Sequence, residues 1–169
     1  NGADYKGYVW FYKGGNQVRV NVDGEVGPDF GVNVSAWADK WISYTATRSG
    51  SAYKLYINGQ QVDQTYTNST NQFSVRTIGW GYSNAYAMQG DLSNTLIYPR
   101  ELTAAEVSQN YYGGPIVTSD LYSMLDAGNL VSYPKTGTTS YELVPGGAGN
   151  GALYNGPTFT PAFGGGWVM

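Results

Sequence analysis

Alternating apolar and polar positions recur along the first two thirds of the chain and predict β-strands. Val18, Val20 and Val22 alternate with polar residues, and the same alternation returns over residues 53–57. A strand with this pattern turns one face to a core and the other to solvent. Further strands are expected at residues 8–12, 41–48, 60–64, 73–80 and 90–98. The chain is therefore predicted to be rich in β-structure.

Local signals also predict one hairpin turn and one helix. Asn58-Gly59, between two alternating runs, is the strongest short hairpin signal in the chain. A helix is expected from about Thr103, because Thr103 can cap its first turn and Glu106 stands three residues later, as a capping box requires. Leu102 and Val107 would hold this helix against a sheet. The pattern thus predicts a single short helix directly after a strand.

The composition of the chain changes after residues 113–115. The remainder is rich in Gly and Pro, with one strand expected around residues 121–125 and shorter strands at 152–154, 157–160 and 164–169. A domain boundary is predicted here, which divides residues 1–113 from residues 114–169.

Composition excludes several function classes. The 169 residues carry 12% charged side chains and a net charge of −3 without a basic run, so nucleic-acid binding through phosphates is not expected. There is no Cys and no His, which removes thiol and imidazole catalysis and most zinc, copper and haem sites. A metal would have to be an oxygen-liganded ion such as calcium. No apolar stretch is long enough for a membrane span, so membrane insertion is not expected.

Four segments together resemble the laminin-G-like, concanavalin-A-like jelly-roll family. They are Trp41-Ile42-Ser43-Tyr44-Thr45, residues 54–59 (KLYING), residues 90–98 and residues 102–111. The resemblance covers about residues 8–112 and implies an all-β concanavalin-A-like jelly-roll sandwich with one short helix near residues 103–111. Jelly rolls support many activities, so the resemblance specifies a fold and leaves function open.

The later part of the chain resembles the opening of such domains in tailed-phage virion proteins, cyanophage-like ones especially. The residues concerned are 125–129, 132–134, 137–139 and 155–159. In that family these segments precede the first core strands, whereas here they come last. The resemblance implies that residues 114–169 complete this sandwich as a permuted segment or complete that of a neighbouring copy, with segment 121–125 as the expected filler. The resemblance also implies that residues 1–113 lack the family's first strands, which normally precede Tyr8. A third alternative is that further polypeptide supplies these strands.

Glycosidase chemistry is not expected. It needs two carboxylates that flank one cleft, and the related glucanases carry closely spaced acids on one strand. No such cluster occurs here; Asp23 and Glu25 lie two residues apart in a turn-like stretch before Gly27-Pro28. The chain is therefore predicted not to be an enzyme.

Calcium binding is a candidate property that the resemblance implies, because such domains often hold calcium at a rim of the sandwich. The candidate donors are Asp91, Asp126 and Asn129. The alternative, which we favour, is that Asp126 and Asn129 make turn hydrogen bonds. No cofactor is required in either case.

Sugar binding is suggested by Trp80, Tyr82, Asn84 and Tyr86, which crowd one predicted loop. Aromatic faces stack on the C–H surfaces of pyranoses, and an amide bonds to their hydroxyls. The alternative, of equal weight, is that Trp80 belongs to the core and the tyrosines cover an edge or a subunit contact. The three tryptophans that precede Trp80 are expected in the core: Trp10, Trp37 and Trp41.

These observations lead to a functional hypothesis of a non-enzymatic structural module on the virion exterior, such as a capsid decoration, head-fibre or tail-fibre component. Its partners would be other copies of itself or other virion proteins, together with cell-surface glycans. The virion assignment rests on the resemblance of residues 125–159. The alternatives are a carbohydrate-binding adhesion module of a bacterial surface protein, at the cell surface, and a subunit of an extracellular filament built by strand exchange.

Overall fold

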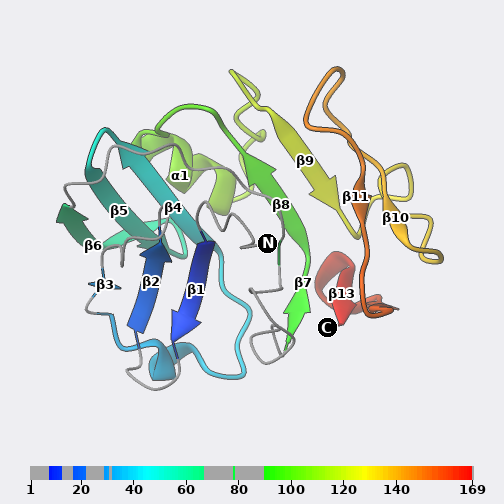
Figure 1. Cartoon of the computed structure of the whole chain (residues 1–169), viewed down its shortest axis with the longest axis horizontal. Coiled ribbons are helices and arrows are strands. Elements are labelled where there is room, and N and C mark those ends of the chain that lie inside the picture. Colours follow the sequence, from blue (N-terminus) through cyan, green and yellow to red (C-terminus); the bar gives the residue numbers. More distant parts are fainter. Residues whose placement is uncertain are drawn as a thin grey trace, which may run out of the picture. The chain divides into compact units, whose positions relative to one another are not determined.

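The computed structural model describes residues 8–12, 17–21, 29–30, 32–66, 78 and 90–168. Its strands pair in antiparallel ladders, and the described residues form one α-helix (Figure 1). The predicted all-β class with one short helix is confirmed. The chain divides into two units, Asn1–Arg76 with Arg100–Val117 and Thr77–Pro99 with Thr118–Met169.

The first unit contains two three-stranded antiparallel sheets, in the orders β1-β2-β3 and β4-β5-β6. The strand expected at residues 8–12 pairs with the next expected strand, since β1 pairs with β2 from Tyr8↔Asn21 to Tyr12↔Gln17. The elements of this unit are β1 (Tyr8–Tyr12), β2 (Gln17–Asn21), β3 (Asp29–Phe30), the 3-10 turn η1 (Val34–Trp37), β4 (Tyr44–Ser49), β5 (Ala52–Ile57), β6 (Gln60–Tyr66) and α1 (Ala104–Tyr111).

The turn between β5 and β6 is the predicted Asn58-Gly59 hairpin turn. Both residues have positive φ, 51° and 76°, as a type I′ turn requires. The Asn58 side chain accepts a 3.0 Å hydrogen bond from the amide of Ser43, and its own amide donates to the Ser43 carbonyl at 2.8 Å. The strand expected from residue 41 begins only at Tyr44, because the amide and carbonyl of Ser43 bond to Asn58 of the turn.

The core of the first unit lies under β5. Tyr53, Leu55 and Ile57 are buried with Phe30, so the predicted alternation is confirmed. Tyr56 is buried as well, where the register against β6 shifts between Leu55 and Tyr56. Half-buried side chains pack around these residues, including that of Trp37 as expected: Val32, Trp37, Ile42 and Tyr44. Trp41 is half-buried, and the side chain of Trp10 lies outside the described part.

Helix α1 follows the predicted capping box. Thr103 is the N-cap, its hydroxyl accepts from the amide of Glu106, and the Glu106 carboxylate accepts from the amide of Thr103. Leu102 and Val107 are buried, as expected. The Ser108 hydroxyl donates a 2.9 Å bond to the carbonyl of Gly59, which ties the helix to the β5–β6 turn.

The second unit combines the strands near residue 90 with the C-terminal part of the chain. β13 lies between β12 and β7, β8 pairs with β9, and β10 pairs with β11, all antiparallel. Its elements are β7 (Asp91–Leu92), β8 (Asn94–Ile97), β9 (Ser123–Asp126), β10 (Thr139–Ser140), β11 (Gly151–Ala152), β12 (Thr158–Thr160), the 3-10 turn η3 (Ala162–Gly164) and β13 (Gly166–Val168).

The single strand expected at residues 90–98 is divided at Ser93 into two short strands, which pair with different partners. β7 pairs with β13, whereas β8 pairs with β9. The Ser93 hydroxyl donates a 2.9 Å bond to the carbonyl of Gly165, and the Ser93 carbonyl accepts from the amide of Ala127. The strand expected at residues 121–125 begins at Ser123, and the three later strands lie within about two residues of their predicted positions.

The core of the second unit is built around Trp167. Trp167 is buried with Ala127 and Tyr133, and the Tyr133 and Trp167 rings meet edge to face at 5.6 Å. Leu92 and Leu125 complete this core from β7 and β9. Strands that the pattern assigned to the first part of the chain thus share a core with the C-terminal segment.

The predicted boundary at residues 113–115 lies close to one unit limit, between Val117 and Thr118, but Thr77–Pro99 groups with the C-terminal segment. Which sandwich residues 114–169 complete stays a prediction. The strand expected at residues 73–80 lies outside the described residues, apart from Ile78. Within the described part, no helix combines the length and apolarity that crossing a membrane demands.

Candidate binding site

The sugar-binding candidates Trp80, Tyr82, Asn84 and Tyr86 lie outside the described residues. Their role therefore stays a prediction.

The candidate calcium donors all belong to the second unit, and two of them make turn hydrogen bonds. Asp126 Oδ1 accepts a 2.8 Å bond from the amide of Gly128, and Asn129 Oδ1 accepts a 2.9 Å bond from the amide of Val131. Asp91 lies in β7, opposite Val168. Among the described residues, no group of three or more His, Cys, Asp or Glu side chains is placed to hold a metal ion. These bonds are what the favoured turn alternative expects, and calcium binding stays a prediction.

The turn from Asp126 to Tyr133 displays two aliphatic side chains. Leu130 is 62% exposed and Val131 is 75% exposed. The backbone on both sides is hydrogen-bonded: the Tyr133 amide donates to the Asn129 carbonyl at 2.7 Å, and the Asp126 amide donates to Ser132 Oγ at 3.1 Å. These bonds order the backbone from which the two exposed side chains project.

Ser132 anchors this turn to the segment that follows β10. Its hydroxyl donates to the Tyr141 carbonyl at 2.7 Å, and its carbonyl accepts from the Tyr141 amide at 2.6 Å. Ser132 and Ser140 are both fully buried, with their hydroxyls 3.3 Å apart. Because buried hydroxyls are costly unless bonded, this pair specifies one arrangement of the turn.

Glu142 clamps the start of β9. Its Oε2 accepts a 2.6 Å bond from the Ser123 hydroxyl, and its Oε1 accepts from the amides of Met124 at 2.8 Å and Val144 at 2.9 Å. Burial by itself raises the pKa of Glu142, but the bonds from Met124, Ser123, Val144 and Leu143 outweigh it and hold the pKa below its usual value. Glu142 is thus an ionised structural anchor.

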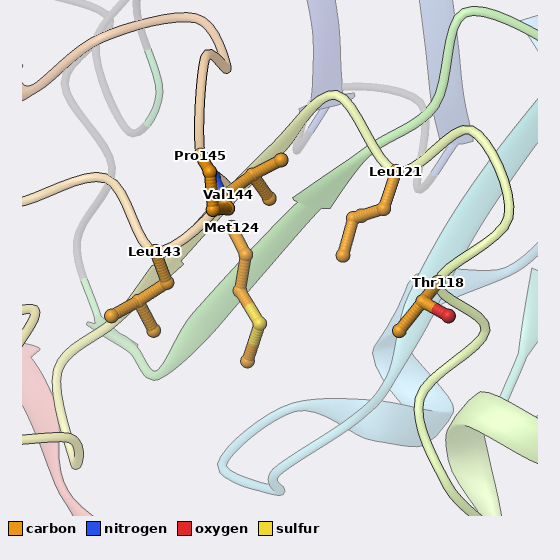
Figure 2. A pocket seen from close by; sticks show the side chains of 6 residues that line it. All are labelled: Thr118, Leu121, Met124, Leu143, Val144 and Pro145. Atoms are coloured by element: carbon orange, nitrogen blue, oxygen red, sulfur yellow. The ribbon is translucent and has the colours of Figure 1, made fainter.

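An apolar pocket of about 310 Å³ lies beside β9 (Figure 2). Met124 projects into it from β9, Leu121 and Thr118 come from the segment before the strand, and the other side is formed by residues after Glu142. One hydroxyl, that of Thr118, is the sole polar side-chain group among the six residues that line it: Thr118, Leu121, Met124, Leu143, Val144 and Pro145. The pocket suits an apolar group rather than a sugar.

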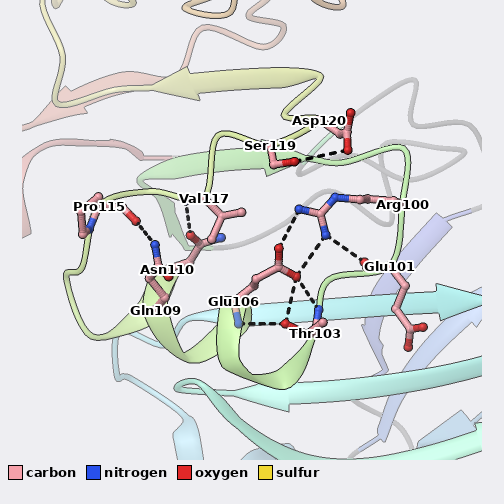
Figure 3. A network of polar contacts seen from close by, with 10 residues as sticks. All are labelled: Arg100, Glu101, Thr103, Glu106, Gln109, Asn110, Pro115, Val117, Ser119 and Asp120. Atoms are coloured by element: carbon pink, nitrogen blue, oxygen red, sulfur yellow. Dashed lines mark hydrogen bonds and ion pairs between the residues drawn. The ribbon is translucent and has the colours of Figure 1, made fainter.

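A second carboxylate, that of Glu106, also makes hydrogen bonds that stabilise the fold (Figure 3). The Arg100 guanidinium donates to it at two points, Nη2 to Oε1 at 2.7 Å and Nη1 to Oε2 at 3.0 Å. These bonds, followed by that from the Thr103 amide, lower the pKa of Glu106 to about 2. Glu106 therefore stays ionised at every physiological pH.

Exposed tyrosines are a further feature of the second unit. Tyr122 is 50% exposed and Tyr154 is 74% exposed, while Tyr141, beside the Leu130–Val131 turn, is 46% exposed. Tyrosine offers a large apolar face and a polar tip, and it is enriched at binding surfaces.

The sequence patterns did not single out the pocket, the Glu142 clamp or the exposed Leu130-Val131 pair. An aliphatic pair is ordinarily expected inside a core. The available signal was the flanking Asp126 to Asn129 turn and Ser132, which place the pair at the tip of a turn.

Comparison with known sequence families gives one match. The family described as the concanavalin A-like lectin/glucanases superfamily, of laminin G type, matches residues 1–108 of the 169. No curated protein and no solved structure matches the chain. The match covers more than half of the chain and agrees with the antiparallel strands and single α-helix described above. The chain therefore belongs to the concanavalin A-like lectin/glucanase superfamily.

Proposed function

We propose that the chain is a non-catalytic binding and assembly module that contacts other protein subunits. We place it on the exterior of a virus particle, as a capsid decoration, head-fibre or tail-fibre component. That location rests on the resemblance of residues 125–159 to virion proteins. The alternative locations are a bacterial cell surface and an extracellular filament.

The observation that carries the non-catalytic part of the proposal is the use of two of the twelve acidic side chains, Glu106 and Glu142. A glycosidase needs a carboxylic acid whose pKa is raised, so that it holds a proton at working pH. The pKa values of Glu106 and Glu142 are both shifted downward, and both groups accept backbone amides. These two acids stabilise local structure and are not suited to protonate a leaving group.

The binding part of the proposal is supported by the apolar and aromatic surface of the second unit. Leu130, Val131 and Tyr154 are each more than half exposed, in a chain with only 12% charged residues. Adjacent exposed apolar side chains, as at Leu130-Val131, suit contact with a partner. Tyr122, Tyr141 and Tyr154 favour glycan adhesion as a second candidate function, because tyrosine faces stack on sugars.

Two measurements on the whole chain test this proposal. Incubation with a panel of soluble glycans is expected to release no reducing sugar between pH 4 and 8. Turnover that an acid-to-amide substitution abolishes would overturn the non-catalytic assignment.

The second measurement combines a glycan array with sedimentation velocity over a wide range of protein concentration. We expect self-association, glycan binding, or both. Glycan binding that Trp80→Ala or Tyr154→Ala removes would assign the adhesion function. A chain that binds no glycan and stays monomeric throughout would overturn the binding and assembly function.

A further inference from the structure

The second unit carries a protruding apolar group, here called the knob, formed by the side chains of Leu130 and Val131. They are 62% and 75% exposed. The Val131 amide is bonded to Asn129 Oδ1, and Ser132 holds the end of the turn through Tyr141. A turn whose backbone is ordered before binding loses little backbone entropy when its side chains dock. The knob therefore has the properties of an interface anchor.

The same unit carries an apolar receptor for such a group, the pocket beside β9. Its volume is about 310 Å³. An apolar cavity of about 150 Å³ already holds a benzene molecule, so this pocket has room for aliphatic side chains. A sugar that entered the pocket would lose hydrogen bonds to water, and among the lining side chains only the Thr118 hydroxyl could replace them.

Neither the knob nor the pocket carries a charged side chain. No charged residue occurs between Ala127 and Pro134, and none lines the pocket. Glu142, the acid next to the lining residue Leu143, has its carboxylate bonded to Ser123, Met124 and Val144. Docking of the knob therefore desolvates no unpaired charge, a cost that would otherwise oppose association.

We propose that the knob of one copy inserts into the β9 pocket of a second copy. The proposal rests on the assembly role proposed above and names its partner and contact. Since knob and pocket are different surfaces, the contact is heterologous and repeats from copy to copy, which builds a ring or a chain of subunits.

The expected strength follows from the size of the contact. Two aliphatic side chains supply only part of the roughly 800 Å² that each partner buries in a stable complex. Association of two free copies is therefore weak, and it becomes effective where many copies are held close together, as on a particle.

Sedimentation velocity of the whole chain, at rising concentration, tests the proposal with two variants. Leu130→Ser with Val131→Ser removes the knob and keeps the backbone hydrogen bonds. Thr118→Arg places a charge at the pocket, and its exposed position makes folding insensitive to the change. The wild type is expected to form larger species with concentration. The knob variant is expected to raise the dissociation constant by about 100-fold, since burying each aliphatic group contributes about tenfold. The pocket variant is expected to raise it by a similar factor, because docking would bury an unpaired charge.

Mixing the two variants gives the sharpest readout. The pocket variant retains its knob and the knob variant retains its pocket, so a 1:1 mixture should form dimers with wild-type affinity and no larger species. Tyr112→Ser, which removes an equally exposed side chain in the first unit, is the control and should associate as the wild type does. Circular dichroism confirms that all variants fold.

Each outcome decides the proposal. Self-association that both variants leave unchanged overturns the knob-and-pocket contact but leaves the assembly function standing. A mixture that stays monomeric also overturns the contact. A wild type that is monomeric at every concentration overturns the contact and, in the absence of glycan binding, the proposed function with it.

Discussion

The carboxylate of Glu142 accepts a 2.6 Å hydrogen bond from the hydroxyl of Ser123, the first residue of β9. The other carboxylate oxygen accepts the amide of Met124, so one side chain holds the start of the strand at two points. β9 in turn pairs with β8 and provides Leu125 to the core around Trp167. A single acid thus supports the strand that joins the C-terminal segment to the strands near residue 90.

We predict that Glu142→Gln destabilises the chain by about 1.5–3 kcal/mol, because a neutral amide cannot accept all of these bonds and its NH₂ group opposes a donor. The measurement is the free energy of unfolding in urea. Glu101→Gln is the matched control: Glu101 forms a half-exposed ion pair with Lys54 at 2.7 Å, and its loss should cost less than about 1 kcal/mol. Equal losses in the two variants would contradict the structural role of Glu142.

The backbones of Gly128 and the Gly164-Gly165 segment are in close contact. A Cβ at Gly128 would lie 2.1 Å from the carbonyl oxygen of Gly164, and a Cβ at Gly165 would lie 2.5 Å from Gly128 Cα. Both neighbours are backbone atoms and cannot move aside as a side chain does. We therefore predict that Gly128→Ala destabilises by about 1–3 kcal/mol, measured by urea unfolding.

Gly114→Ala is the control for that substitution. A Cβ there would meet Gln109 Cγ at 3.0 Å, which is part of a flexible side chain that can shift. It should cost clearly less than Gly128→Ala. If both substitutions were equally tolerated, the close approach of the turn after β9 to the segment before β13 would be wrong.

The lowered pKa of Glu106 predicts how stability depends on pH. The pKa is about 2 in the folded chain against an ordinary value of 4.5. Folding therefore favours the ionised form of Glu106. Its contribution to the free energy of unfolding is complete above about pH 4.5 and is lost as the pH falls toward 2. Glu142, whose pKa is also lowered, contributes in the same direction.

Thermal unfolding of the wild type and of Glu106→Gln between pH 7 and pH 2 measures this contribution. Glutamine keeps the capping box but does not titrate. The melting temperature of the wild type should fall more steeply below pH 4.5 than that of the variant. Parallel curves would show that the Arg100–Glu106 pair does not stabilise the folded state.

Elements specified by neighbouring residues could be predicted from the sequence. The β5–β6 hairpin follows from Asn58-Gly59, and α1 follows from Thr103 and Glu106, because each signal acts over two to four residues. The division of one expected strand at Ser93 could not be predicted, since the Ser93 hydroxyl bonds to Gly165, 72 residues away.

The candidate surface was less predictable than the fold, for a physical reason. Leu130 and Val131 have apolar side chains that ordinarily pack inside a domain, and only the bonds of Asn129, Ser132 and Tyr141 place them in solvent. The pocket likewise gathers residues from two segments of the chain, 118–124 and 143–145, which are separated by 18 positions. Local sequence patterns do not predict contacts between residues that are far apart in the chain.

The pairing of β8 with β9 within one chain is tested most directly by cysteine cross-linking, because the sequence contains no Cys that could interfere. Leu96 and Met124 face each other in this ladder, and directly opposed strand residues have a Cα separation that a disulfide can span. Leu96→Cys with Leu125→Cys is the control, since Leu125 is one position out of register and its side chain lies on the opposite face.

We expect mild oxidation of the Leu96→Cys, Met124→Cys variant to give a disulfide within single chains in high yield. On a non-reducing gel this product runs as a monomer, faster than the reduced chain, while the control pair forms little disulfide. A covalent dimer as the main product would show that β9 pairs with a neighbouring copy, and equal yields for both pairs would contradict the register itself.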